Sequence, residues 1–225
     1  MTVGFDLGSR KLCREKILDS RKDDDMTQAG EEAGAQNVPQ RGSTRDRILE
    51  AATVLFYENG IRATSADRVI ERVGITKVTF YRHFRTKDDL VVAYLERRAA
   101  WERSAVDHAR ASSTSALEAL RLMAQGIGGE SCRPGFRGCP FINAAAEYPD
   151  PEHPVRVTVD AHRRWFHQAM AEIVEQARVP DLAVAADQLV MLRDGAMVSG
   201  YLSDPERVAA TLETGYRAVL GAATV

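Results

Sequence analysis

No run of apolar residues in the sequence approaches the roughly 18 that a membrane-spanning helix needs. The N-terminal region alternates charged residues and has no apolar stretch of the kind that secretory signals carry. Three cysteines in 225 residues cannot form a disulfide framework. We therefore expect a cytoplasmic protein that has no membrane partner.

Several motifs of catalysis are also missing. The chain has no phosphate-binding loop, no G-x-S-x-G elbow and no H-E-x-x-H pair. Gly126-Ile127-Gly128-Gly129 follows a predicted helix rather than a strand, so it is not a dinucleotide fingerprint. Cys132 and Cys139 have a spacing that matches no common zinc site. We therefore expect no catalytic residue, no cofactor and no metal site. An enzyme is the alternative functional class against which a binding protein is weighed.

The net charge of −2 conceals an uneven distribution along the chain. Residues 41–100 carry twelve lysine or arginine residues against eight acidic ones, a net charge of +4. Residues 101–225 carry twelve arginines against sixteen acidic residues, a net charge of −4. A basic segment ahead of an acidic body is typical of a region that binds a polyanion, although chance can produce the same pattern.

Residues 1–42 are rich in charged and small polar residues, and we predict a disordered tail. From Ser43 onward, apolar residues recur at helical spacing with no persistent strand-like alternation. Helix-capping patterns begin at Ser43, Thr64 and Thr86, each with an aspartate three residues later. The sequence predicts an all-α protein, with a DNA-binding domain over residues 43–90 and a helical domain over residues 91–225.

Two short predicted helices, separated by Gly74, occupy residues 65–84 and have helix-turn-helix spacing. Phe80 and Phe84 are four residues apart and lie on the same side of the second helix, so we expect both to point into a small core formed by three helices. Val78 and Arg82 lie nearly opposite them. An arginine can pair bidentately with guanine and a valine can contact a thymine methyl group, so this face is suited to the major groove. A solvated polar helix face is the alternative.

The stretch from Gly74 to Leu90, GITKVTFYRHFRTKDDL, resembles the signature of the tetracycline-repressor (TetR) family of transcription regulators. Supporting matches are the segment RILEAA at residues 47–52, Phe56, Gly60 and Thr64. The resemblance implies a three-helix DNA-binding head, a fourth helix that links it to the body, and a helical body that dimerises and binds a small effector. A shorter resemblance at residues 138–151 points to one branch of the family.

The resemblance also implies roles for individual residues. Lys77, Val78, Thr79 and Arg82 correspond to base-reading positions, whereas Tyr81, His83 and Lys87 correspond to phosphate contacts. Thr64 and Ser65, at the start of the second helix, correspond to positions that contact the DNA backbone. A structural role for His83 is the alternative. The full predicted DNA-contacting set is Arg45, Thr64, Ser65, Thr76, Lys77, Val78, Thr79, Tyr81, Arg82, His83 and Lys87.

Large apolar and aromatic residues in the body are candidates for an apolar effector pocket. Plain core packing is the alternative for each of them. His162 lies among apolar residues of a long predicted helix and is the best polar candidate. The predicted pocket residues are Met123, Phe136, Phe141, His162, Trp165, Phe166, Met170 and Met191.

The two C-terminal helices, predicted at Leu182–Leu202 and Pro205–Leu220, carry stripes of small and apolar residues. In the resembled family this pair packs across a two-fold axis, so we expect a homodimer. An intramolecular core is the alternative. The predicted interface residues are Leu189, Leu192, Ala196, Leu212, Tyr216 and Val219.

Together these features predict a one-component regulator, most simply a repressor that binds a palindromic operator and is released by a small, mostly apolar effector. A thiol-sensing regulator that uses Cys132 and Cys139 is one alternative, because Arg133 and Arg137 lie nearby in sequence. A helical adaptor for other proteins is a second alternative.

Overall fold

The structure is a computed structural model that describes residues 42–177 and 179–221. The predicted tail lies outside this part, apart from Gly42. The helices are α2 (Thr44–Asn59), α3 (Ala66–Val73), α4 (Lys77–His83), α5 (Lys87–Ala111), α6 (Ala116–Ser131), α7 (Pro140–Glu147), α8 (Pro154–Glu175), α9 (Leu182–Leu202) and α10 (Val208–Gly221), with a 3-10 turn at Pro205–Arg207 before α10. No strand occurs in the described residues, so the all-α prediction is confirmed.

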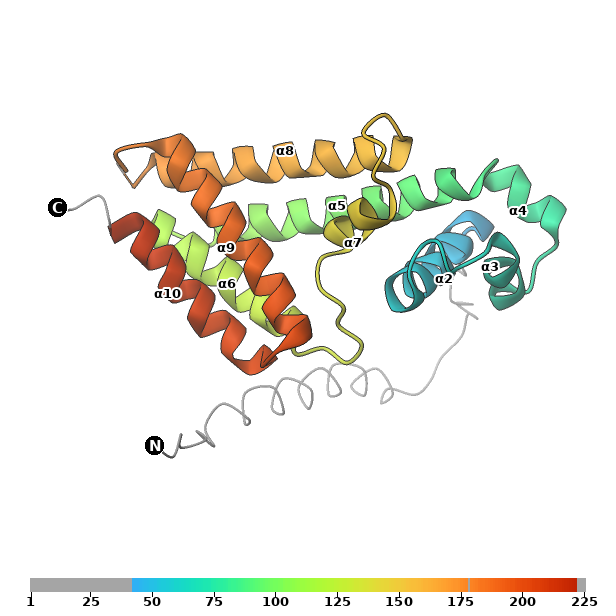
Figure 1. Ribbon diagram of the computed structural model, residues 1–225, viewed down its shortest axis with the longest axis horizontal. Helices are drawn as coiled ribbons and strands as arrows, with labels where there is room; N and C mark the ends of the chain where they lie inside the picture. Colours follow the sequence, from blue (N-terminus) through green and yellow to red (C-terminus); the bar gives the residue numbers. More distant parts are fainter. Residues whose placement is uncertain (1–41, 178, 222–225) are drawn as a thin grey trace, which may run out of the picture.

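Helices α2, α3 and α4 form a head at one end of the molecule, and α5 runs from this head into the body (Figure 1). Helix α8 lies along α5, while α9 and α10 pair with each other and pack over α6. The 25 residues of α5 span about 37 Å. Because α5 begins at Lys87, the predicted boundary between residues 90 and 91 falls inside a continuous helix.

The first turns of these helices are held by local side-chain caps. Ser43 and Asp46 form a reciprocal capping box at α2, and Thr86 and Asp89 form another at α5. At α3 the expected cap is wrong by one residue: the Ser65 side chain, not that of Thr64, accepts the hydrogen bond from the Arg68 N–H. Gly74 ends α3 in the left-handed conformation (φ 71°), which glycine adopts without steric cost.

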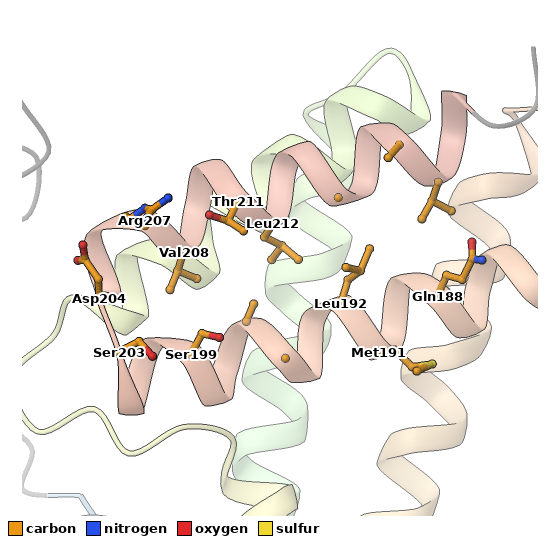
Figure 2. Close-up of a pocket in the computed structure, with 15 residues that line it drawn as sticks. Gln188, Met191, Leu192, Ser199, Ser203, Asp204, Arg207, Val208, Thr211 and Leu212 are labelled. Atoms are coloured by element: carbon orange, nitrogen blue, oxygen red, sulfur yellow. The ribbon is translucent and has the colours of Figure 1, made fainter. Parts of the chain in front are cut away.

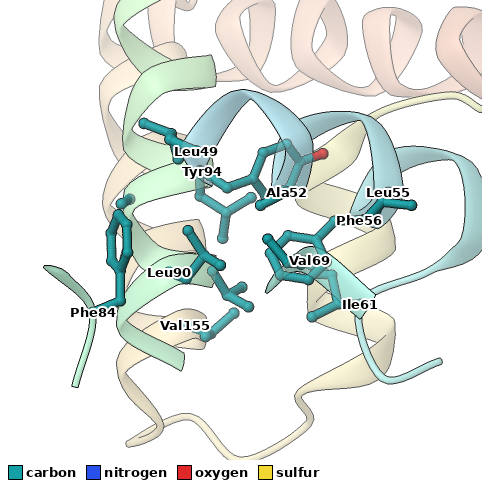
Figure 3. Packing of buried hydrophobic residues seen from close by; sticks show 14 of the residues in the cluster. Leu49, Ala52, Leu55, Phe56, Ile61, Val69, Phe84, Leu90, Tyr94 and Val155 are labelled. Carbon is teal, nitrogen blue, oxygen red and sulfur yellow. The ribbon is translucent and has the colours of Figure 1, made fainter. Parts of the chain in front are cut away.

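Two hydrophobic clusters stabilise the molecule. The first joins the head to the body, because Leu90 and Tyr94 of α5 and Val155 of α8 pack against the head residues Phe56 and Val69 (Figure 3). The second joins the far end of α5 to α6, α8, α9 and α10. The head therefore shares its core with the helices that carry the body. Within the described residues, no helix has the length and apolarity needed to cross a membrane.

Candidate DNA-binding surface and interior cavity

Helix α4 presents one side to the core and the other to solvent. Phe80 and Phe84 are buried, whereas the Val78 side chain is 71% exposed and Tyr81 is 47% exposed. Arg82 is also exposed. An apolar residue, an aromatic residue and an arginine are thus exposed together on one short helix, a composition that can contact base edges and phosphates.

Neighbouring side chains restrain the rim of this surface. The Lys77 ammonium group pairs with Asp67 of α3 at 2.8 Å, and the Arg45 guanidinium lies 5.0 Å from the centre of the Phe84 ring. Thr76 caps α4 by accepting a hydrogen bond from the Thr79 N–H. Lys87, at the start of α5, is partly covered, and this burial lowers the pKa of its ammonium group.

Thr64 is a correction to the predicted DNA-contacting set. Its side chain is fully buried, and its hydroxyl donates hydrogen bonds to the carbonyl groups of Leu55 and Gly60. It therefore stabilises the turn between α2 and α3 and cannot reach a phosphate. Ser65 is exposed at the start of α3, and His83 is half-buried at the end of α4.

A cavity of about 340 Å³ lies in the body between α5, α6, α8 and α9. Of the predicted pocket residues, Met123 and Phe166 line it. Trp101, Val106, Leu122, Ile127 and Met197 complete most of its apolar wall. Its polar wall residues include Arg98, Glu102 and Arg193.

The other predicted pocket residues lie elsewhere. Phe141 is buried and stacks on the His162 ring, with ring centroids 3.6 Å apart. Met170 is buried in the second cluster, with Trp165 packed against that cluster. Phe136 lines a small hollow between α2, α5 and the loop before α7. The prediction that Met191 lines the effector pocket is wrong, because this residue of α9 is 72% exposed.

A buried group of charges borders the cavity. The Glu102 carboxylate Oε2 lies 3.1 Å from His162 Nε2 and accepts a hydrogen bond from Arg193 Nη2 at 3.0 Å. Burial alone raises the pKa of Glu102, but the His162 hydrogen bond and the Arg193 charge outweigh it, and the pKa is lowered. Arg193 also donates a hydrogen bond to the Cys139 sulfur at 3.1 Å. The charges thus link α5, α8 and α9 to the start of α7.

Glu102 and Arg193 were not among the predicted site residues, although the sequence carries a signal for both. Glu102 falls on the apolar stripe of α5 between Ala99 and Val106, and Arg193 falls on that of α9 between Leu189 and Ala196. A charged residue at such a position is buried only when it is paired, so each one implies a partner on another helix.

A second hollow is an open, mostly apolar groove of about 980 Å³ between α9 and α10 (Figure 2). Of the predicted interface residues, Leu192, Ala196, Leu212 and Val219 line it. Leu189 and Tyr216 are wrong as interface residues, because both are fully buried within the protomer. Met191 lies at the edge of this groove rather than in the interior cavity.

Comparison with known proteins gives a consistent result. The sequence profile described as "Bacterial regulatory proteins, tetR family" matches residues 48–94, and one described as "Tetracyclin repressor-like, C-terminal domain" matches residues 116–210. The crystal structure of SCO4454, a TetR-family transcriptional regulator from Streptomyces coelicolor, is 44% identical, with a TM-score of 0.78 over 81% of this chain and 96% of that one. The chain belongs to the TetR family.

Other relatives are more distant from this chain. The regulator YjdC of Escherichia coli is 24% identical over 68% of this chain and 81% of its own length. The transcriptional activator FasR of Mycolicibacterium smegmatis is 32% identical over 36% of this chain and 37% of its own length. The prediction from the sequence that this protein is a TetR-family transcriptional regulator is therefore confirmed.

Proposed function

We propose that this TetR-family regulator binds a palindromic operator as a homodimer and releases it when a small, mostly apolar molecule occupies the cavity between α5, α6, α8 and α9. The observation that carries the proposal is α5 itself. Its first turn is capped next to the α4 surface, and its later turns supply Trp101, Glu102 and Val106 to the cavity wall. One rigid helix thus touches both sites.

Dimerisation is proposed from the groove between α9 and α10. This groove is open and mostly apolar, and Met191 projects from α9 at its edge. Two such faces related by a two-fold axis would cover each other. The two α4 helices would then have to meet successive major grooves, about 34–36 Å apart.

Release of DNA follows from that spacing requirement. A ligand that shifts α5 changes the distance between the two heads, and a coupling of about 1–3 kcal/mol would weaken operator binding by about 5–150-fold. Repression is proposed because a dimer bound to an operator blocks other proteins from that DNA and needs no additional surface for contacting them. A dimer that raised transcription of a reporter gene from the same DNA would contradict repression while leaving the DNA-binding proposal intact.

A mobility-shift titration on the DNA upstream of the protein's own gene tests the DNA-binding step. We expect binding there that is tighter than on random DNA of equal length, with affinity falling steeply as salt rises because phosphate contacts release counterions. Equal affinity for both DNA molecules would contradict the proposal. It would instead favour an adaptor or an enzyme.

A further inference from the structure

One side of the cavity, formed by α5, carries two polar side chains whose hydrogen-bonding capacity is unfilled. Arg98 and Glu102 both line the cavity and are one helical turn apart. Among the described residues, the Arg98 guanidinium makes no hydrogen bond or ion pair, and its Nε atom is buried. The guanidinium lies 4.7 Å from the centre of the Trp101 ring, another wall residue.

Glu102 offers the opposite kind of group. Its Oε2 atom already serves His162 and Arg193, whereas Oε1 accepts no hydrogen bond from any residue in the part of the chain that the structure describes. Only 8% of Glu102 is exposed, but Oε1 is not among the buried side-chain atoms that lack a hydrogen-bond partner, so this oxygen keeps some exposure beside the cavity that Glu102 lines. A bound molecule that donates a hydrogen bond to it replaces water there, and a hydrogen bond to a charged group is stronger than one between neutral groups.

The remainder of the wall is mostly apolar. The aromatic rings are those of Trp101 and Phe166, with aliphatic contacts from Val106, Leu122 and Ile127 and two methionines, Met123 and Met197. The volume of about 340 Å³ is near the lower end of the range for small-molecule sites. A ligand that fills this space is compact, presents apolar surface on most sides and can lie against an aromatic ring.

We infer that the cavity takes a neutral, mostly apolar aromatic molecule bearing a hydroxyl group, which donates a hydrogen bond to Glu102 Oε1 and accepts one from Arg98. This inference rests on the proposed function only in treating the cavity as the effector site. A hydroxyl group serves both residues because it is donor and acceptor at once. A carboxylate would satisfy Arg98 but repel Glu102, and an ammonium group would satisfy Glu102 but repel Arg98.

Three probes of similar size separate these possibilities: 4-phenylphenol, its methyl ether 4-methoxybiphenyl, and biphenyl-4-carboxylate. Their dissociation constants are measured on the full chain by equilibrium dialysis. We expect 4-phenylphenol to bind at least about tenfold more tightly than either of the others, because only it fills both vacant positions. Equal or tighter binding of the ether or the carboxylate would overturn the inference, as would failure of 4-phenylphenol to bind.

Variants locate the effect at the cavity wall. The substitution Arg98→Met keeps the apolar stem and removes the donors, so it should weaken the binding of 4-phenylphenol and of its ether alike, because the oxygen of either molecule can accept a hydrogen bond from Arg98. The ratio of the two dissociation constants reports the donation to Glu102 and should stay within about threefold of its wild-type value. Arg97→Met changes the preceding exposed arginine, which does not line the cavity, and should leave both dissociation constants unchanged. Weaker binding of 4-phenylphenol in both variants, or in neither, would contradict the assignment of Arg98. Circular dichroism confirms that each variant is folded.

Operator binding by the same protein preparations keeps the two proposals distinguishable. A chain that binds its operator but shows no preference for the phenol refutes the ligand class alone. A chain that shows the preference but binds operator and random DNA alike refutes the regulatory proposal, while the chemistry of the cavity stands.

Discussion

The carboxylate of Glu147, the last residue of α7, accepts hydrogen bonds from the backbone N–H groups of Ile61 at 2.9 Å and Arg62 at 2.6 Å. Ile61 and Arg62 lie in the turn between α2 and α3, so a side chain of the body holds the backbone of the head. A second link lies nearby, where the Tyr148 hydroxyl donates to Asp88 at 3.1 Å. The start of α7 contacts Arg193 through Cys139, so α7 joins the cavity's charged border to the head.

The contact of Glu147 with the head predicts a local effect of its removal. Glu147→Ala leaves two backbone donors without their acceptor, so we expect stability to fall by about 1–2 kcal/mol. Hydrogen–deuterium exchange should accelerate in the peptide that covers Ile61 and Arg62. Glu152→Ala, in the exposed turn between α7 and α8, is the control and should change neither quantity. Unchanged exchange at Ile61 and Arg62 in Glu147→Ala would show that the turn does not depend on α7.

Arg82 and Lys87 should contribute to DNA binding in different ways. Arg82 is exposed on the outer side of α4, so Arg82→Ala should cost about 1–3 kcal/mol on the operator and relax the preference at one base pair. Lys87 stands at the N-terminus of α5, and Lys87→Ala should weaken all sequences alike and flatten the salt dependence. Mobility shifts on operator and random DNA at several salt concentrations measure both. An equal loss on the two DNA molecules for Arg82→Ala would contradict base reading.

The groove between α9 and α10 allows a test of dimerisation that spares the protomer's core. Met191 is already 72% exposed, so Met191→Glu should not disturb folding, but it would place a charge in the proposed interface. We expect a folded monomer by light scattering, with operator affinity reduced by about 10²-fold or more as avidity is lost. Val157→Glu, at a 50% exposed position on α8, is the matched control and should remain dimeric. A dimeric Met191→Glu variant would place the interface elsewhere.

Local sequence signals predicted the helices well because the forces that set a helix end are local. The capping boxes at Ser43 and Thr86 and the stop at Gly74 each depend on residues within one turn. Thr64 shows the limit of such signals. Ser65 caps α3 although no aspartate follows it three residues later, and only the long-range fold shows that the Thr64 hydroxyl donates to the carbonyl groups of Leu55 and Gly60 instead.

The sites were less predictable because they depend on how helices face one another. Leu189 and Leu192 belong to one apolar stripe, yet Leu189 is fully buried in the second cluster and Leu192 lines the open groove. A periodic pattern identifies an apolar face but not which part a neighbouring helix covers. Similarly, the pairing of Glu102 with Arg193 joins residues 91 positions apart, and no local rule specifies it.

The lowered pKa of Glu102 predicts how its contribution to stability depends on pH. The ionised carboxylate stabilises the folded state above its ordinary pKa of 4.5, and this stabilisation is lost as the pH falls through the lowered pKa of the folded protein. His162, Arg193 and Arg98 are the charged or titratable groups near it. Glu102→Gln should therefore be less stable than the wild type near pH 7, and the difference should shrink in acid. Urea unfolding at several pH values measures it, and a difference that grows as the pH falls would contradict the assignment.

Two glycines of α6 predict opposite effects of the same substitution. At Gly128, an added Cβ atom would lie 2.6 Å from the Ala209 Cβ and 3.0 Å from the Ala209 backbone nitrogen, so α10 would have to move. Gly128→Ala should thus cost about 1–3 kcal/mol despite its better helix propensity. At Gly126, none of the described residues beyond the adjoining turns of α6 places an atom within 4 Å of the added Cβ, so Gly126→Ala should stabilise the helix by up to about 1 kcal/mol.

Urea unfolding at one fixed protein concentration measures both changes, because the stability of an assembling protein depends on concentration. The two midpoints should move in opposite directions from the wild type, with the slope unchanged in each case. Both glycines lie in the same helix, two residues apart, so helix propensity and unfolded-state entropy affect the two substitutions almost equally. The difference between the two changes in stability therefore reports the contact with Ala209. Equal stabilisation of the two variants would mean that α6 and α10 are not in close contact at Gly128.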